Sequence, residues 1–160
     1  MSTCIIIQKL IKSLISSKNS GELILNESSV KGDICLDKKC FHCCVETEMV
    51  LSPEDIRRIS AEVKENPKQF LVKTEDGLKI LKNKKRDNGD LVCFFLNEDG
   101  LCSIYDFRPK GCTFYPLIWD MKQHKVISDD YCPYYKLFSP FIKKFANQIE
   151  DFVFRLYGEI

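Results

Sequence analysis

The chain has 160 residues, of which 44% are hydrophobic, and its formal net charge is +1. This length predicts a single domain, residues 1–160, that is large enough to bury a core of its own. The near-neutral charge provides no overall attraction to nucleic acid or to a membrane. Glycine is scarce, at 7 residues, and none of it forms a GxGxxG or Walker loop, which argues against the standard nucleotide-binding loops.

An amphipathic helix is predicted within residues 1–18. Ile7, Leu10, Ile11 and Leu14 repeat at helical spacing, and the apolar run is too short to span a bilayer. We expect this helix to pack on the domain, and the alternative is a helix that contacts a membrane surface or a partner. Because no export signal is recognisable, we expect a cytoplasmic protein, whose thiols stay reduced.

A short strand is expected at residues 22–26, and a cysteine-rich loop follows it. Ser52, Pro53 and Asp55 then predict the start of a helix. Serine caps a helix, proline suits its first position, and acidic residues complement the helix dipole. Asn66 and Pro67 are expected to end this helix.

Residues 70–96 predict β structure, in which residues 78–81 and 91–96 flank a polar turn at residues 87–90, as in a hairpin. A second tight turn at residues 97–100 should bring Cys93 and Cys102 toward each other. Residues 117–119 and 126–127 are expected to pair, and Ser139 and Pro140 to open a final helix over residues 139–158. The predicted fold class is α+β, a small antiparallel sheet with flanking helices and a cysteine-ligated metal centre.

Cysteine is the residue type that points to chemistry, because the chain has 9 of them. Cys4 stands apart, and the others are Cys35, Cys40, Cys43, Cys44, Cys93, Cys102, Cys112 and Cys132. At this density in a chain without an export signal, thiolates are metal ligands before they are disulfides. Cys40 and Cys43 have the spacing of a two-ligand knuckle, and the later cysteines adjoin turns, glycine or proline.

The number of centres and the metal both remain open at this point. These cysteines suffice for two four-sulfur centres, and a single centre with spare thiols is equally allowed. Four-sulfur sites select zinc or iron–sulfur, and spacing does not separate the two. Because the thiols exceed the needs of one zinc ion, we favour an iron–sulfur cluster of the [4Fe–4S] type, with zinc as the alternative.

Two stretches resemble the signatures of the CxxCxxCC cysteine-cluster family, a zinc- or iron-chelating domain. The first is CFHCC at residues 40–44 with LSPEDI at residues 51–56, and the second is CFFL at residues 93–96 with GLCSIYDFRPKGCTFYP at residues 100–116. Cys132 before Pro133 also fits, so the resemblance covers roughly residues 35–135, the expected cysteine-cluster core. The family's first cysteine would fall at Asp37, whereas the nearest one here is Cys35.

The resemblance implies metal binding by these cysteines and says less about activity. The first hypothesis is therefore an accessory or interaction module. The alternative is an iron–sulfur enzyme or enzyme subunit related to protein lysine methylation, since flagellin lysine methylases are among the family's larger relatives. No motif here supplies a cosubstrate pocket, and no catalytic residue is assigned.

Other side chains are candidates for supporting roles. Arg108, part of the family's RP pair, is expected to donate hydrogen bonds to cluster sulfurs or to offset their charge, and the alternative is a surface salt bridge with Asp106. Tyr105 and Tyr115 are expected to form an apolar wall that limits access of solvent. His42 is predicted to be an exposed loop residue and not a ligand.

One basic cluster predicts a surface that binds a partner, which we expect to be a protein or a ribonucleoprotein. It consists of Lys79, Lys82, Lys84, Lys85 and Arg86. Such a run can contact RNA or an acidic protein, although charge runs are usually solvated faces, and the neutral overall charge weakens the nucleic-acid interpretation.

Overall fold

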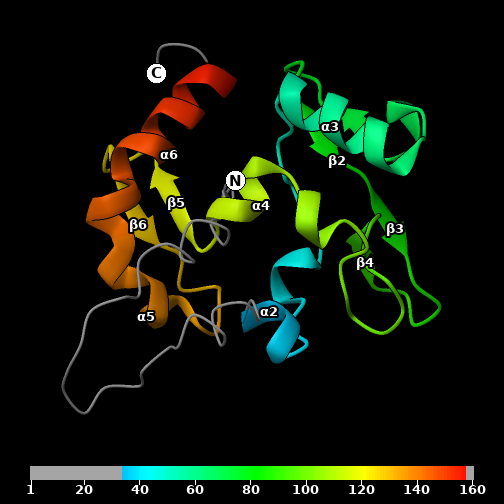
Figure 1. Cartoon of the computed structure of the whole chain (residues 1–160), viewed down its shortest axis with the longest axis horizontal. Coiled ribbons are helices and arrows are strands. Elements are labelled where there is room, and N and C mark those ends of the chain that lie inside the picture. The colour runs from blue at the N-terminus through cyan, green and yellow to red at the C-terminus, as the bar shows by residue number, and fades with distance from the viewer. Residues whose placement is uncertain (1–33, 158–160) are drawn as a thin grey trace.

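The structure is a computed structural model, and it describes residues 34–157 (Figure 1). The helix predicted within residues 1–18, the strand at residues 22–26 and Cys4 lie outside the described residues. The described part combines short helices with antiparallel strand pairs, as the α+β class requires. The assignment of residues 1–160 to one domain stays a prediction.

Residues 34–157 contain three separate two-stranded sheets where the sequence predicted one small sheet. The antiparallel pairs are β1 (Leu71–Lys73) with β2 (Lys79–Leu81), β3 (Asn83–Lys85) with β4 (Leu91–Cys93), and β5 (Leu117–Asp120) with β6 (Lys125–Ser128). The hairpin expected between residues 78–81 and 91–96 is therefore wrong. Gly77 and Gly89, with φ of 91° and 93°, each close a tight turn, so β2 and β4 both have a nearer partner.

Helix α3 (Pro53–Val63) begins where the sequence predicted. The hydroxyl of Ser52 accepts a hydrogen bond from the amide of Asp55, and the Asp55 carboxylate accepts one from the Ser52 amide, which makes a capping box. The helix ends at Lys64, which takes the left-handed conformation. Asn66 then caps a separate 3₁₀ turn, η3 (Pro67–Gln69).

The C-terminal part follows the prediction except at one cap. Trp119 pairs with Val126, as expected. The last segment runs through α5 (Tyr135–Phe138), the 3₁₀ turn η5 (Ser139–Phe141) and α6 (Ile142–Tyr157). Ser139 does not cap the final helix, because the chain already turns helically before it, and its hydroxyl donates to the carbonyl of Tyr135 at 3.3 Å.

Two hydrophobic cores flank the middle of the described chain. The first packs α3 and β1 to β4 around Ile59, Phe70 and Leu81. The second packs β5, β6 and α6 around residues that include Phe145 and Ile149. Figure 1 shows these two groups on opposite sides, with α4 (Lys110–Phe114) between them and α2 (Ile34–Asp37) beside it. The cysteines come from segments of both groups, so they meet in this middle region.

Candidate metal centre

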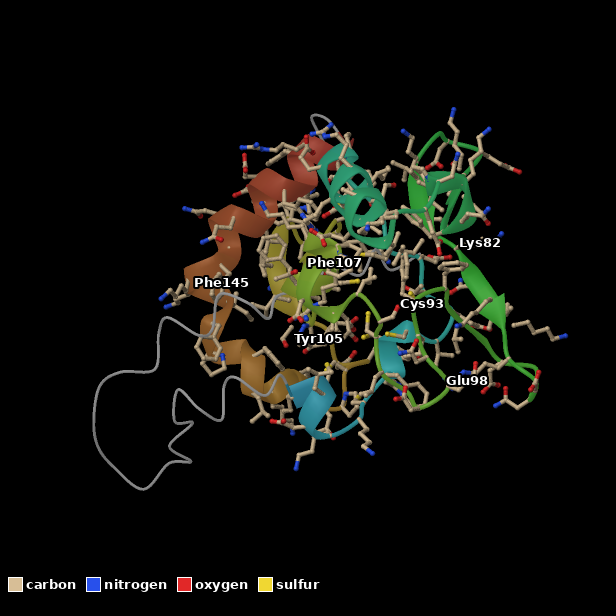
Figure 2. All side chains as sticks on the ribbon, turned by 45° about the vertical axis from the view of Figure 1, so that its right-hand side comes forward. Lys82, Cys93, Glu98, Tyr105, Phe107 and Phe145 are labelled. Carbon is tan, nitrogen blue, oxygen red and sulfur yellow. The ribbon has the colours of Figure 1, made fainter. Side chains whose placement is uncertain are left out.

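Seven of the cysteines line one cavity of about 60 Å³. They are Cys35, Cys40, Cys43, Cys44, Cys102, Cys112 and Cys132. Cys93 is not part of this lining; it is buried in the first core, and Figure 2 shows it on the inner side of its strand. A buried water molecule needs a cavity of only about 10–15 Å³, so this cavity is larger than a single water molecule requires.

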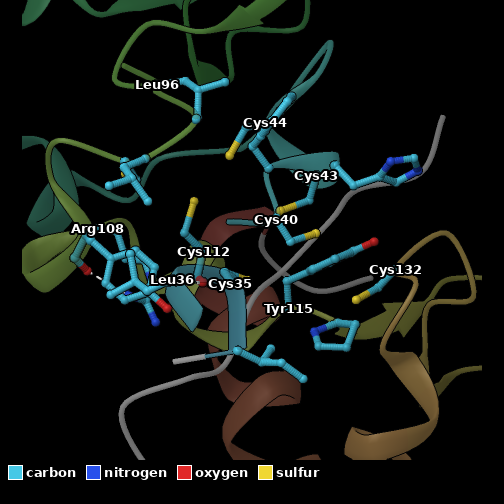
Figure 3. A pocket seen from close by; sticks show the side chains of 18 of the residues that line it. Cys35, Leu36, Cys40, Cys43, Cys44, Leu96, Arg108, Cys112, Tyr115 and Cys132 are labelled. Atoms are coloured by element: carbon cyan, nitrogen blue, oxygen red, sulfur yellow. Dashed lines mark hydrogen bonds between the residues drawn. The ribbon is translucent and has the colours of Figure 1, made fainter. Parts of the chain in front are cut away.

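Backbone turns deliver the first four cysteines to the cavity. Lys39, at φ 47°, ends α2 in the left-handed conformation, and the Cys40 amide donates to the Cys35 carbonyl at 2.8 Å. The 3₁₀ turn η2 (His42–Cys44) follows, closed by a hydrogen bond from the Cys44 amide to the Phe41 carbonyl at 2.8 Å. Two tight turns in succession therefore bring Cys35, Cys40, Cys43 and Cys44 to the lining of the same cavity (Figure 3).

The turn at residues 97–100 folds the chain back, as expected, so that Cys102 lies close to the segment that carries Cys93. Leu96 and Cys102 form an antiparallel bridge, and the Asn97 amide donates to the Leu101 carbonyl at 2.7 Å. Gly100 has a φ of 79°, and a Cβ atom there would meet the ring of Phe41 at 2.9 Å. The turn thus packs directly against the segment that carries Cys40, Cys43 and Cys44.

Four of the thiols influence one another in every pairing. The charge of Cys44 raises the pKa of Cys93, Cys102 and Cys112, that of Cys102 raises the pKa of Cys93 and Cys112, and that of Cys93 raises the pKa of Cys112. A second set of neighbours is formed by Cys40 with Cys44 and with Cys132. In Figure 3 the sulfur atoms of Cys44 and Cys112 point toward one another, and those of Cys40, Cys43 and Cys132 gather on the other side of the cavity.

Burial in the cavity favours the neutral, protonated form of these thiols in the metal-free protein. A hydrogen bond with Cys43, followed by burial, raises the pKa of the Cys44 thiol, and burial raises the pKa of Cys112. Burial also raises the pKa of Cys102 to about 11. A bound metal ion reverses this balance, because a coordinated thiol loses its proton.

The donor set suits a soft metal, whereas the side chains do not form a finished coordination sphere. Within residues 34–157, no group of three or more Cys, His, Asp and Glu side chains is arranged so that it could hold a metal ion. The fit of a metal to this site therefore rests on the kind, number and mutual proximity of the thiols.

Arg108 supplies a positive charge at this cavity. Its side chain is 7% exposed, and its guanidinium lies 3.8 Å from the ring centre of Tyr105. It donates to the carbonyl of Tyr105 at 2.7 Å and to the carbonyl of Cys112 at 3.2 Å. Its charge lowers the pKa of Cys44, Cys102 and Cys112, against the stronger effects that raise it.

A profile of the CxxCxxCC family, described as "Putative zinc- or iron-chelating domain", matches residues 34–133. The chain belongs to this family. No curated protein matches it, and no solved structure matches it.

This chain departs from the CxxCxxCC pattern at the first cysteine of that pattern. Asp37, where the family has cysteine, is exposed on α2. Cys35, one half-turn earlier, is half-buried and lines the cavity. A thiol therefore still reaches the cavity from α2, although from a different helical position.

Two tyrosines and one histidine that the sequence marks as candidates lie at or near this cavity. Tyr105 and Tyr115 both line the cavity, and Tyr115 is buried. His42 is exposed, as predicted, although it lies at the edge of the cavity, and its ring centre is 4.4 Å from that of Tyr131, which does not line the cavity. Sequence reasoning missed Tyr131, because nothing in its local pattern marks a residue that stacks on a histidine far away in the chain.

Two further findings concern surfaces. Arg86 turns inward: its guanidinium donates to the Asn97 carbonyl and lies 5.5 Å from the ring centre of Phe41. The lysines at positions 79, 82 and 85 are exposed, and Lys84 is half-buried. Among residues 34–157, no helix has the length and apolar character that crossing a membrane requires.

Proposed function

We propose that this CxxCxxCC chain holds a [4Fe–4S] cluster on Cys44, Cys93, Cys102 and Cys112 and acts as an accessory or interaction module. The observation that carries the proposal is the mutual proximity of these four thiols, of which Cys44, Cys102 and Cys112 line the cavity and Cys93 lies buried next to them. Four cysteine thiolates are the usual ligands of such a cluster, which supplies one-electron redox chemistry or a structural cross-link when bound. The remaining cavity thiols then stand beside the centre as neighbours.

The size of the cavity supports a cluster over a single zinc ion. A zinc ion draws four sulfurs to about 2.3 Å and leaves no room between them for water. The cavity here has a volume of about 60 Å³, and its wall includes the apolar side chains of Leu96, Leu101 and Phe138. Zinc remains the alternative occupant, and it would suit the same sulfur ligands.

The proposed ligands join segments that are far apart in the chain. Cys44 is the last residue of η2, Cys93 ends β4, Cys102 follows the turn at residues 97–100, and Cys112 lies in α4. Binding of a metal centre by such scattered residues adds its free energy to folding. A reducing compartment such as the cytoplasm suits free thiols, and we propose this location on that chemical ground.

Serine variants of single cysteines test the ligand set. Replacing Cys44, Cys93, Cys102 or Cys112 by serine is expected to lower the iron and sulfide content of anaerobically purified protein to a small fraction of the wild-type value. Cys35→Ser and Cys132→Ser serve as matched controls from the same cavity and should retain the metal. Loss of metal in the controls with retention in the four variants would refute the assignment.

The partner surface remains a proposal about the exposed lysines. Figure 2 shows Lys82 on the outer side of the strands, and Lys79 and Lys85 are exposed as well. Arg86 is excluded from this surface by its inward contacts. We propose that these lysines contact a protein or ribonucleoprotein partner. Replacing the three with glutamate should abolish binding to a single-stranded RNA probe. Undiminished binding by the variant would reject these lysines as the contact surface, and no binding by the wild type would argue against nucleic acid.

A role related to protein lysine methylation is the second candidate. A shallow hollow of about 310 Å³ lies beside the thiol cavity and shares Arg108 with it. Lys110 and Thr113 are among the residues that line it, and it could receive a small cosubstrate. Calorimetric titration with S-adenosylmethionine tests this role, and the absence of binding heat at high concentration would reject the methylase version.

A further inference from the structure

Asp55 is a fully buried carboxylate, with 0% of its surface exposed. Removing an ionised carboxylate from water is costly unless hydrogen bonds and opposite charge replace the lost solvent. The sequence explains Asp55 as part of the cap of α3, and a cap alone does not require such complete burial. Its other contacts show where it is anchored.

One carboxylate oxygen of Asp55 serves the cap. Oδ2 accepts hydrogen bonds from the hydroxyl of Ser52 at 2.8 Å and from the amide of Ser52 at 3.2 Å. These bonds lie within one helical turn and fix the first residues of α3. They do not reach the metal cavity.

The other oxygen reaches across the fold. Oδ1 accepts from the amide of Lys110, the first residue of α4, at 2.9 Å, and from the guanidinium of Arg58 at 2.7 Å. Arg58 in turn donates to the carbonyl of Arg108 at 2.8 Å and to that of Phe107 at 3.4 Å. The carboxylate and its arginine therefore hold the backbone on both sides of Pro109.

This held segment carries two groups of the metal cavity. Arg108 points its guanidinium to the carbonyl of Cys112, and Cys112 lies in the helix whose first amide Asp55 binds. Both side chains line the cavity. A shift of the segment would displace the cavity's positive charge and one of its thiols together.

We propose that Asp55, through Arg58, is a positioning residue for the metal centre that holds Arg108 and Cys112 in place at the cavity. The inference rests on the proposed metal-binding function and adds a role to a residue that otherwise only caps a helix. Groups hydrogen-bonded directly to metal ligands typically contribute 10- to 100-fold to metal affinity, and Asp55 and Arg58 act one step further out, through the backbone, so the lower end of this range applies. We expect loss of this anchor to act within that range.

Arg58→Met tests the anchor without touching the capping box. Arg57→Met is the matched control, because Arg57 is the neighbouring residue and pairs at the surface with Glu54, with 70% of its side chain exposed. The assay is the rate at which the purified protein releases its own metal, iron or zinc, to a colorimetric chelator. We expect Arg58→Met to release metal roughly tenfold faster or more, and Arg57→Met to match the wild type.

A double variant separates positioning from general loosening of the fold. If Arg58 acts through Arg108, Arg58→Met should cause no further acceleration in an Arg108→Gln background, since coupled residues give non-additive effects. Asp55→Asn should resemble Arg58→Met, because the amide would present a donor to groups that all donate. Equal release from Arg57→Met and Arg58→Met, or fully additive effects in the double variant, would overturn the proposal.

A metal-free readout keeps the inference separate from the proposed function. In the metal-free protein, alkylation of Cys112 should be faster in Arg58→Met than in the wild type, with Cys93 as internal reference. A wild-type protein without metal would refute the proposed function alone, and the alkylation result would then decide whether Arg58 positions Cys112. Unchanged alkylation of Cys112 would refute the positioning role.

Discussion

Gly100→Ala is the substitution whose effect the structure defines most sharply. The residue has a φ of 79°, and the new methyl group would lie 2.9 Å and 3.1 Å from two atoms of the Phe41 ring. Two costs follow. A left-handed backbone costs a non-glycine residue about 1–2 kcal/mol, and forcing a group into a packed contact adds about 1–3 kcal/mol.

Gly89→Ala provides the matched control. Gly89 also has a positive φ, of 93°, but nothing lies within 4 Å of a Cβ atom built there. The backbone cost is therefore shared, and the contact with Phe41 is not. We expect Gly100→Ala to lower the free energy of unfolding by about 1–3 kcal/mol more than Gly89→Ala does.

The assay is urea unfolding of the metal-loaded protein, followed by its metal content. Because Phe41 lies between Cys40 and Cys43, Gly100→Ala should also reduce metal occupancy, and Gly89→Ala should not. In a Phe41→Leu background the excess cost of Gly100→Ala should shrink, since the smaller side chain leaves space. Equal destabilisation by the two glycine variants would refute the packing of this turn against the cysteine segment.

Three further predictions concern stability. In urea melts, the metal-free protein should lose stability between about pH 9 and pH 11. The Cys102 thiol keeps its proton in the folded protein up to a pKa of about 11, whereas the same thiol in the unfolded chain loses it at a pKa of 9.0. A free energy of unfolding that stays constant over this pH range would contradict the prediction. Phe145→Ala should cost roughly 3–5 kcal/mol of unfolding free energy, and Phe154→Ala, whose side chain is 39% exposed, much less. Removal of the metal by a chelator should lower the Tm, and an unchanged Tm would argue against scattered ligands.

Local signals in the sequence predicted the local structure. Ser52 caps α3 as expected, with Asp55 completing a capping box, and Trp119 pairs with Val126 across the expected turn. Cap and turn chemistry operate within a few residues, so their outcome is readable from the sequence. The strand partners of residues 78–81 differ from the prediction because a turn at Gly77 pairs these residues with the strand immediately before them.

Contacts between distant segments could not be predicted in the same way. The bond from the Lys110 amide to Asp55 and the inward turn of Arg86 over Phe41 depend on how the elements pack. A buried carboxylate and an exposed capping carboxylate have the same sequence signature. The gathering of the cysteines was foreseeable from their number and spacing, whereas the four-way grouping that includes Cys93 required the fold.

The central claim is a cysteine-bound iron–sulfur cluster. The most direct test is to measure iron, acid-labile sulfide and the visible spectrum of anaerobically purified protein. For a [4Fe–4S] cluster we predict iron and sulfide in equal amounts, about four of each per chain, with broad absorption near 400 nm from thiolate and sulfide bound to iron. Stoichiometric zinc with a featureless visible spectrum would contradict the cluster and leave a structural metal site. Protein without any metal would contradict the metal centre itself.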